Sequence, residues 1–508
     1  KRVTPCVGAE QEYFLLPKSL YAQREDLRLT GRTLFGATPP KGQELEDHYF
    51  GTIRTRVANF MIDLDQQLWR LGILSKTKHN EVAPCQHEMA PIYSSANSAC
   101  DANQLAMQVM KKCAAKHNLV CLLHEKPFAG VNGSGKHNNW SLSTDSGKNL
   151  FSPGKTPSQN AQFLVFLSAF IKGVDEYQDF LRSTVASAGN DHRLGASEAP
   201  PAIVSIFLGD ELTAVVDSII HSTNYKDPGK SLMRIGVDVL PSIPKDTTDR
   251  NRTSPLAFTG NKFEFRMLGS SQSIAGPNIA LNTIMAEVLG EFADILEKAQ
   301  DFETALQKLV CDTLTQHQRI IFNGNGYSKE WEEEAKRRGL SNLRSSADCL
   351  PAYVSEKNIR LVTKRGIFTE SEFRARYEIH LDAYCKMVSI EAKTSIDMVL
   401  HQILPAATAY TKDLCDTLTV KKSLSVPATA EEKLIARLSD TTNRLYEVCE
   451  QLKQNMDTIP EGKEEAALYY QNVILTGMAD MRKEADILEQ LTAKSYWPYP
   501  TYSDLLFY

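Results

Sequence analysis

The stretch Glu10-Gln11-Glu12-Tyr13-Phe14 places two carboxylates at alternate positions, and two further stretches carry polar side chains in the same way. These are His137-Asn138-Asn139-Trp140-Ser141 and Lys262-Phe263-Glu264-Phe265-Arg266. Because alternate side chains of a strand point to opposite faces, each stretch would direct these polar groups to one face. The sequence therefore predicts a sheet face that carries carboxylates, an imidazole and a guanidinium group, which suits divalent metals and phosphate.

Glu10 and Glu12 are the two carboxylates that share one stretch. From the rise of a strand, their Cα atoms would lie about 6.6 Å apart. That separation suits two carboxylates that serve adjacent cations. A solvated strand face is the alternative interpretation, and the pair alone does not exclude it.

A second acidic pair, Glu81 and Glu88, lies on either side of Pro84. A turn at this proline would return the second carboxylate toward the first. Oxygen-rich sites favour Mg²⁺ or Mn²⁺ over Zn²⁺. We interpret the neighbouring His79 and His87 as structural. The candidate metal ligands are Glu10, Glu12, Glu81, Glu88, His137 and Glu264.

The composition is that of a soluble globular protein. With 508 residues, the chain is long enough for two or more domains and a large core. Its net charge of −5 gives no general attraction to nucleic acid or to anionic membranes, and no apolar run is long enough to span a bilayer. The ten cysteines include no Cys-x-x-Cys pair, so we expect reduced core residues and a cytoplasmic location.

The chain changes character near Pro277. Before it, Gly, Pro and Asn are frequent, and we predict helices over Asn103–Lys116 and Ala161–Leu181 and a loop over Arg28–Phe50. Val204–Leu208 fits either a strand or a helix. After Pro277, long apolar periodicity predicts a mostly helical half that serves as scaffold and oligomer contact. Its predicted helices are Asn278–Cys311, Ser371–Leu404, Ala430–Asp457 and Glu464–Leu491, with Thr429 as the N-cap of the third.

A glycine-rich segment, Gly130-Val131-Asn132-Gly133-Ser134-Gly135-Lys136-His137, almost matches a phosphate-binding P-loop. The position that should be Ser or Thr is His137, and Asn138–Ser143 alternates like a strand instead of starting a helix. We therefore reject the P-loop. The glycines more plausibly let the backbone approach a small ligand closely.

Two loops carry arginines, His192–Pro201 with Arg193 and Asp249–Pro255 with Arg252. A guanidinium group is suited to bidentate binding of a carboxylate or a phosphate. A surface loop with scattered charge is the alternative for either loop taken alone.

Together, and in this order, these segments resemble the glutamine synthetase family from about Gly8 to Gly269. The insertion Tyr21–Phe50, the sequence Val131–Leu142, the helical second half and the terminal Trp497-Pro498-Tyr499-Pro500 resemble its large type III members. The resemblance implies an α+β fold. A catalytic domain over residues 1–290, with a curved and mainly antiparallel sheet flanked by helices, is followed by a largely helical C-terminal region over residues 291–508.

The resemblance also implies a role for each matching residue. Glu12, Glu81 and Glu88 would hold a first metal, and Glu10, His137 and Glu264 a second. Substrate glutamate would be held by Asn132, Gly133, Arg193 and Arg266. Glu198 would close the site and help to deprotonate ammonium. Arg252 and Arg266 would contact the transferred phosphoryl group, and the nucleotide would lie against Asn139, Ser141, Arg252 and Tyr93.

The activity that the resemblance implies is ATP-dependent ligation of ammonia to L-glutamate through a γ-glutamyl phosphate. It further implies two or more Mg²⁺ or Mn²⁺ ions per site and a homo-oligomer of stacked hexameric rings forming a dodecamer, with no nucleic acid or membrane partner. One alternative is a ligase that joins glutamate to an amine or polyamine. Another is a non-catalytic relative, against which the six candidate metal ligands argue.

The chain departs from the family pattern in three respects. Ala257 stands where the family has another Arg, five residues after Arg252, and Asn139 stands where bacterial type I enzymes have a His. The family's N-terminal β-grasp domain, with an Asp that binds ammonium, should precede Gly8 and is not in the sequence. We therefore expect this chain alone to lack part of the active site.

Overall fold

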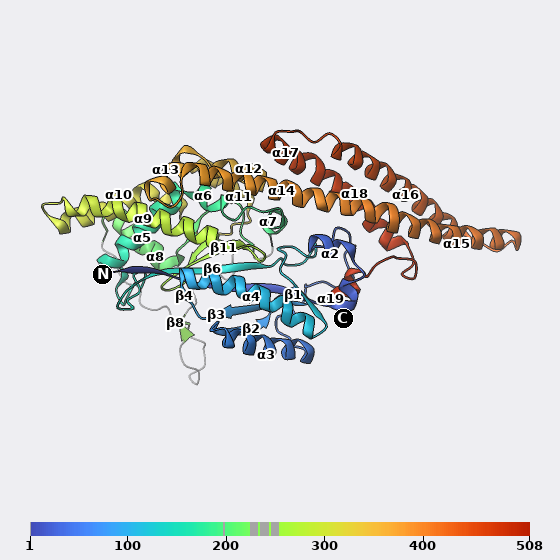
Figure 1. Ribbon diagram of the computed structural model, residues 1–508, viewed down its shortest axis with the longest axis horizontal. Helices are drawn as coiled ribbons and strands as arrows, with labels where there is room; N and C mark the ends of the chain where they lie inside the picture. Colours follow the sequence, from blue (N-terminus) through green and yellow to red (C-terminus); the bar gives the residue numbers. More distant parts are fainter. Residues whose placement is uncertain (1, 197–198, 224–231, 234–242, 245–252) are drawn as a thin grey trace.

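The computed structural model describes residues 2–196, 199–223, 232–233, 243–244 and 253–508 (Figure 1). Among them, nine strands form one sheet in the order β2-β3-β1-β6-β11-β10-β7, with β4 and β5 also paired to β1. Every pairing is antiparallel except that of β10 with β7. The strands are β1 (Val3–Pro17), β2 (Ser75–Asn80), β3 (Gln86–Pro91), β4 (Ser94–Ser95), β5 (Leu119–Leu122), β6 (Gly135–Thr144), β7 (Ile206–Phe207), β10 (Leu256–Phe258) and β11 (Phe263–Gly269), and a separate pair joins β8 (Leu232–Met233) to β9 (Ile243–Pro244).

The long strand β1 organises this sheet, and its alternating sequence explains how. Val7 and Ala9 point into one hydrophobic core, and Tyr13 and Leu15 point into a second core on the same face. Glu10 and Glu12 have the opposite parity and therefore lie on the other face. The predicted strands and their shared polar face are thus confirmed, as is the α+β fold.

Helices pack against the apolar side chains of the sheet in both hydrophobic cores. In Figure 1, α3 (Thr55–Arg70) lies below the strands, and α5 (Ala161–Glu176) and α9 (Ala275–Glu297) lie above them. The rings of Phe170 on α5 and Phe263 on β11 stack with centroids 3.6 Å apart. This contact fixes the strand that carries Glu264 against the helical layer.

Shorter elements complete the first half of the chain. They are α1 (Lys18–Tyr21), α2 (Glu25–Thr30), α4 (Ala96–Lys116), the 3₁₀ turn η1 (Pro157–Gln159), α6 (Gln178–Ser183), α7 (Ala188–Arg193) and α8 (Gly209–Ile220). The predicted helix Asn103–Lys116 is therefore confirmed within α4. The one predicted over Ala161–Leu181 divides at Tyr177 into α5 and α6, and the ambiguous Val204–Leu208 contains the strand β7.

The second half is helical, as predicted. Its long helices α14, α15, α16 and α18 run beyond the sheet in Figure 1. Its elements are α10 (Phe302–His317), η2 (Gln318–Ile320), α11 (Lys329–Arg337), α12 (Ser346–Tyr353), α13 (Glu356–Lys364), α14 (Glu370–Met398), the π-helical η3 (Val399–Ile403), α15 (Leu404–Ser423), α16 (Thr429–Met456), α17 (Lys463–Tyr469), the π-helical η4 (Tyr470–Ile474), α18 (Leu475–Leu491) and α19 (Tyr502–Leu506).

Two helices of this half were predicted with wrong boundaries. The one predicted over Asn278–Cys311 divides into α9, which ends at Glu297, and α10, which begins at Phe302. Thr429 is the first residue of α16, and Ala428 is its N-cap without a side-chain hydrogen bond. Capping boxes occur instead at α12, α14 and α19. At α14, the Thr369 side chain accepts from the Glu372 amide, and the Glu372 carboxylate accepts from the Thr369 amide.

The insertion predicted as a loop over Arg28–Phe50 contains neither helix nor strand beyond the end of α2. It is nevertheless anchored to the helical half. The Arg32 guanidinium donates to both oxygens of Glu391 on α14, at 2.8 and 2.7 Å. The hydroxyls of Thr33 and Tyr502 lie 2.6 Å apart, so the end of the chain also packs on the insertion.

All ten cysteines are free thiols, as expected. Burial raises the pKa of Cys349 to about 11, which keeps this thiol protonated and unreactive. In the described part of the chain, no helix combines the length and the apolar character needed to cross a bilayer.

Replacing Phe263 by Ala tests the packing of the sheet. The variant removes a fully buried ring stacked on Phe170, so we expect the free energy of unfolding to fall by about 3–5 kcal/mol. The matched control is Phe302→Ala, whose ring is 57% exposed. We expect this control to change the value by under about 0.5 kcal/mol. Urea unfolding followed by tryptophan fluorescence gives both values, and equal losses would contradict the packing described here.

Candidate active site

The register of the sheet aligns three site residues on adjacent strands. His79 on β2 lies opposite Glu88 on β3, and Glu88 lies opposite Glu12 on β1. Directly paired residues of neighbouring antiparallel strands have their Cβ atoms about 5 Å apart, so these side chains meet on one face. Glu12 and Glu88 are both buried.

The turn between β2 and β3 adds Glu81 to this row. Its backbone folds back as predicted around Pro84, with the Glu81 amide donating to the Gln86 carbonyl. His79 Nε2 lies 3.0 Å from Glu88 Oε1, and His79 Nδ1 lies 3.5 Å from Glu81 Oε1. These three residues, which we call the His79 cluster, have ligand atoms within 4.8 Å of one another.

A second group, the His137 cluster, lies on the next strands of the same face. His137 on β6 lies opposite Glu10 on β1, and its Nδ1 is 3.5 Å from Glu10 Oε2 and 2.9 Å from Glu264 Oε1. The three ligand atoms again lie within 4.8 Å of one another. The trio expected from the sequence as the second metal site is thus brought together.

Charge pairing governs the protonation of both clusters. Burial alone would lower the pKa of His137, but hydrogen bonds to Glu10 and Glu264 raise it to about 10. The hydrogen bond to Glu88 raises the pKa of His79 to about 9. Although burial opposes it, the contact with His137 lowers the pKa of Glu264 well below its usual range. In each cluster, a proton on an imidazole therefore neutralises part of the carboxylate charge.

These donor sets fit divalent cations. In the described part of the chain, the buried Glu88 Oε2 and His137 Nε2 have no hydrogen-bond partner. Carboxylate oxygens and an imidazole nitrogen are suitable ligands for Mg²⁺ or Mn²⁺, and a bound cation would replace the imidazole proton.

Glu12 connects the metal-binding face to the glycine loop. Its Oε2 accepts a hydrogen bond from the Gly135 amide at 2.5 Å, and burial raises its pKa. Asn132 lies in the same loop, where its amide and side chain exchange hydrogen bonds of 2.8 and 2.7 Å with Gln43 of the insertion. Lys136 is the second residue of the strand β6 and does not start a helix, which confirms that the segment is not a P-loop.

Arg193 ends α7 and packs directly on this loop. A Cβ at Gly135 would lie 2.0 Å from Arg193 Nη2, and one at Gly133 would lie 3.1 Å from Arg193 Cγ and 2.4 Å from the Glu125 carbonyl oxygen. Glycine is therefore required at both positions. The buried guanidinium also donates to backbone carbonyls of β11, including that of Leu268 at 3.3 Å.

Arg266 is bound to the His137 cluster through Glu264. Its Nε lies 3.2 Å from Glu264 Oε1, and its Nη2 donates to Glu264 Oε2 at 3.3 Å. The guanidinium is buried beside the carboxylate, so it places a fixed positive charge next to the His137 cluster. Ala257, where the family pattern has an arginine, lies directly opposite Glu264 on β10.

The residues expected at the nucleotide gather near the start of β1. Asn139 Nδ2 donates to the Gly8 carbonyl at 3.2 Å and to Glu10 Oε1 at 2.9 Å. Ser141 lies opposite Cys6, and Tyr93 contacts Gly8, because a Cβ there would lie 3.2 Å from the Tyr93 Cβ. Tyr93 is 68% exposed.

Two expected site residues, Glu198 and Arg252, lie outside the described residues. Conversely, sequence reasoning missed two residues that contact the expected site residues. His79, which was interpreted as structural, contacts both Glu81 and Glu88. Its spacing of two residues from Glu81 was the available signal. Gln43, which holds Asn132, carried no signal within a loop of irregular sequence. His87 does pack structurally, with Nδ1 3.0 Å from Asn80 Oδ1.

Among the described residues, Asp63, Cys113 and His117 form a further group of possible metal ligands between α3 and α4, apart from the His79 and His137 clusters. Cys113 Sγ lies 3.4 Å from Asp63 Oδ2, and His117 Nε2 lies 3.1 Å from the same oxygen. Burial, with Asp63 nearby, raises the pKa of Cys113 to about 12. Hydrogen bonds to the carboxylate account for this group, and we assign no metal to it.

The sequence of this chain is similar to those of known glutamine synthetases. The family model described as "Glutamine synthetase, catalytic domain" matches residues 1–204, and "Glutamine synthetase C-terminal domain" matches residues 305–422. The type-3 glutamine synthetase of Dictyostelium discoideum is 48% identical, covering 100% of this chain and 70% of its own length. The glutamine synthetases of Butyrivibrio fibrisolvens and Bacteroides fragilis (strain YCH46) are 47% and 43% identical over 100% of this chain, and 73% and 72% of their lengths are covered.

The number of bound Mn²⁺ ions tests the two clusters directly. We expect Glu88→Gln and Glu264→Gln each to remove one tightly bound ion, because each variant removes a carboxylate charge from a different cluster. Free Mn²⁺ measured by electron paramagnetic resonance gives the count. The control Glu372→Gln alters an exposed carboxylate at the start of α14 and should leave the count unchanged. Unchanged counts in both site variants would contradict the assignment.

Proposed function

This chain belongs to the glutamine synthetase family, so its activity is ATP-dependent synthesis of glutamine from glutamate and ammonia, and we propose that the carboxylate face of its sheet is the catalytic centre. The two clusters of acidic and imidazole ligands carry this proposal. The reaction needs positive charge beside the transferred phosphoryl group, and divalent cations held by these ligands would supply it.

We propose one divalent cation, Mg²⁺ or Mn²⁺, at each cluster. Glu12 would join Glu81 and Glu88 at the first position, with His79 beside them, and Glu10, His137 and Glu264 would hold the second. Bound cations supply charge that stabilises the phosphoryl group during transfer. The buried, unpartnered oxygen of Glu88 and nitrogen of His137 support this placement.

Substrate glutamate would bind at the glycine loop. We propose that Asn132 and Gly133 contact it and that Arg193 pairs with its carboxylate. The close packing of Arg193 on Gly133 and Gly135 supports this role, because it places a guanidinium beside backbone that a ligand can approach. Glu12, bonded to the Gly135 amide, would couple the position of the loop to the first cation.

Two steps then follow from the chemistry. The glutamate side-chain carboxylate is a poor electrophile, so ATP phosphorylates it first, and ammonia then displaces phosphate to form the amide. Arg266, held beside Glu264, would face the charge that develops on the phosphoryl group. Arg252 would assist there, and Glu198 would take a proton from ammonium. The nucleotide would lie near Asn139, Ser141 and Tyr93.

The alternative activity, ligation of glutamate to an amine or polyamine, is not favoured, because the three relatives that span the whole chain are glutamine synthetases. A non-catalytic role is opposed by the ligand clusters themselves.

We also propose a homo-oligomer of stacked hexameric rings, which the exposed apolar side chains Ile62, Trp69, Leu71 and Leu74 support as a contact surface. A cytoplasmic location is supported by the free thiols. We further propose a catalytic domain over residues 1–290 and a helical region over residues 291–508, a division supported by the two family matches over residues 1–204 and 305–422.

His137→Ala tests the catalytic proposal. The variant removes a ligand of the second cluster and leaves Glu10 and Glu264 to repel each other, so we expect kcat for ATP-dependent glutamine formation to fall about 100-fold or more. The control is His401→Ala, an exposed residue on η3 paired with Asp397, which should keep its activity. Near-normal turnover of His137→Ala at saturating Mg²⁺ would refute the role of this cluster.

Arg193→Ala tests the glutamate site. We expect KM for glutamate to rise about 10- to 100-fold, because a charged hydrogen-bonding partner is lost, with a much smaller change in KM for ATP. Gly135→Ala, whose Cβ would displace Arg193 Nη2, should act in the same direction. The control Arg344→Ala affects an exposed ion pair with Glu332 and should change neither constant. An unaltered glutamate dependence in Arg193→Ala would exclude the role.

A further inference from the structure

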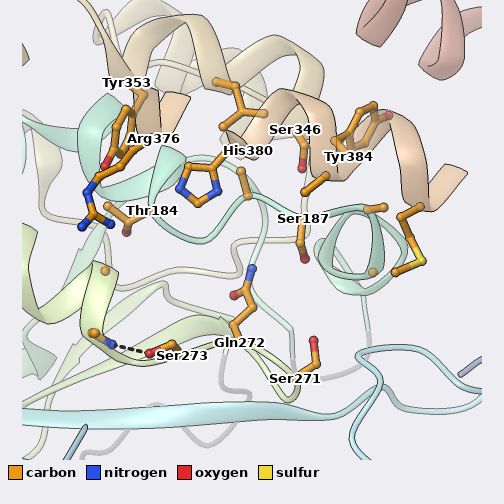
Figure 2. A pocket seen from close by; sticks show the side chains of 18 of the residues that line it. Thr184, Ser187, Ser271, Gln272, Ser273, Ser346, Tyr353, Arg376, His380 and Tyr384 are labelled. Atoms are coloured by element: carbon orange, nitrogen blue, oxygen red, sulfur yellow. Dashed lines mark hydrogen bonds between the residues drawn. The ribbon is translucent and has the colours of Figure 1, made fainter. Parts of the chain in front are cut away.

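A cavity of about 510 Å³ lies behind the proposed glutamate site, where the sheet domain meets the helical half. One wall is a single face of α14, formed by Arg376, His380, Ala383, Tyr384 and Met387. The spacing of these residues follows the turn of a helix. Figure 2 shows Arg376 and His380 extending from this helix toward Thr184, Ser187 and Gln272, which come from the sheet domain.

The chemistry of the walls favours a flat, apolar ligand with one negative charge. Rings of Phe180, Tyr353 and Phe368 line the cavity together with small apolar side chains. Arg376 is exposed at the mouth of the cavity, without an ion pair among the described residues, and its guanidinium lies over the Phe368 ring at 4.6 Å. A guanidinium without an acceptor, at the edge of an aromatic pocket, is suited to a carboxylate.

The other ionisable groups of the cavity do not compete for that role. Burial lowers the pKa of His124 to about 4, and burial together with the Arg376 charge lowers the pKa of His380, so both imidazoles are neutral near pH 7. Glu125 Oε1 accepts from the amide and the hydroxyl of Ser271, at 3.0 and 2.5 Å. Arg376 therefore supplies the positive charge that faces a ligand.

The volume of the cavity fits the range of small-molecule sites, which bury most of a ligand against apolar and aromatic walls.

We propose that this cavity is an effector site for a small aromatic monocarboxylate, whose ring packs between α12 and α14 and whose carboxylate pairs with Arg376. Occupation of the site alters glutamate binding at the neighbouring active site. This regulatory part rests on the proposed function of Arg193 and the glycine loop, whereas the binding part does not.

Helix α7 provides one physical connection between the two sites. Ala188 and Gly189 line the cavity, and the same helix ends at Arg193. Asp191 accepts hydrogen bonds from the amide and hydroxyl of Ser346, a cavity residue on α12, at 2.8 Å each. A ligand that shifts α12 or α7 therefore moves the helix that carries Arg193.

Glu125 provides a second connection. Its carboxylate holds Ser271 at the cavity wall, and its carbonyl accepts from the Ser134 amide of the glycine loop at 2.8 Å. A Cβ at Gly189 would lie 2.1 Å from Glu125 Oε2, so helix α7 and this carboxylate are in tight contact. Movement at the cavity wall is thereby transmitted to backbone beside Gly133.

Binding of indole-3-acetate to the full chain, measured by calorimetry without ATP or divalent metal, tests the site. We expect one molecule per chain, with the neutral indole-3-acetamide about tenfold weaker or worse because it cannot form the ion pair. Arg376→Met should weaken the acetate about 10- to 100-fold. Ala383→Phe, which fills the cavity, should also block binding. The control Arg374→Met removes an exposed arginine of the same helix that pairs with Glu370, and it should bind normally.

Kinetics test the coupling separately. Indole-3-acetate should change KM for glutamate in the wild type and in Arg374→Met but not in Arg376→Met. No binding to the wild type, equal binding of the acetamide, or full affinity in a stably folded Arg376→Met would overturn the site. Binding with unchanged KM would overturn the coupling. Normal binding to this chain, with no glutamine formed by a version extended by the expected N-terminal domain, would instead contradict the proposed function and leave the site standing.

Discussion

The crowding of like charges on one sheet face is the constraint on which the rest of the structure depends. In the described part of the chain, five glutamate carboxylates, those of Glu10, Glu12, Glu81, Glu88 and Glu264, reach this face beside two imidazoles. Two unit charges 4 Å apart repel by about 4 kcal/mol at an effective dielectric constant near 20. Such a row is tolerable only with compensating positive charge, which protons on His79 and His137 supply in part and divalent cations supply more fully.

The local parts of this face could be predicted from the sequence, because they depend on short-range rules. Alternation in β1, β6 and β11 assigned Glu10 and Glu12 to one face and Tyr13 to the other. Pro84 between two acidic residues indicated the turn that joins Glu81 to Glu88. The long helices of the second half followed from their apolar periodicity.

Contacts that depend on register or on distant segments could not be predicted in this way. His79 belongs to its cluster because β2 pairs with β3 so that His79 faces Glu88, and one residue of slippage would place it on the opposite face. Gln43 reaches Asn132 from an irregular loop, and Arg32 reaches Glu391 across more than half of the chain. The family resemblance, not periodicity, supplied the roles of Arg193 and Arg266.

The same packing that places the catalytic residues connects them to the helical half. Helix α7 is bonded to α12 through Asp191 and carries Arg193, so the substrate site and the interface cavity share one rigid element. The most direct test of the central account is anomalous diffraction from crystals soaked in Mn²⁺. Two peaks are predicted, one beside Glu81 and Glu88 and one among Glu10, His137 and Glu264. A single peak, or peaks away from these residues, would contradict a two-cation carboxylate face.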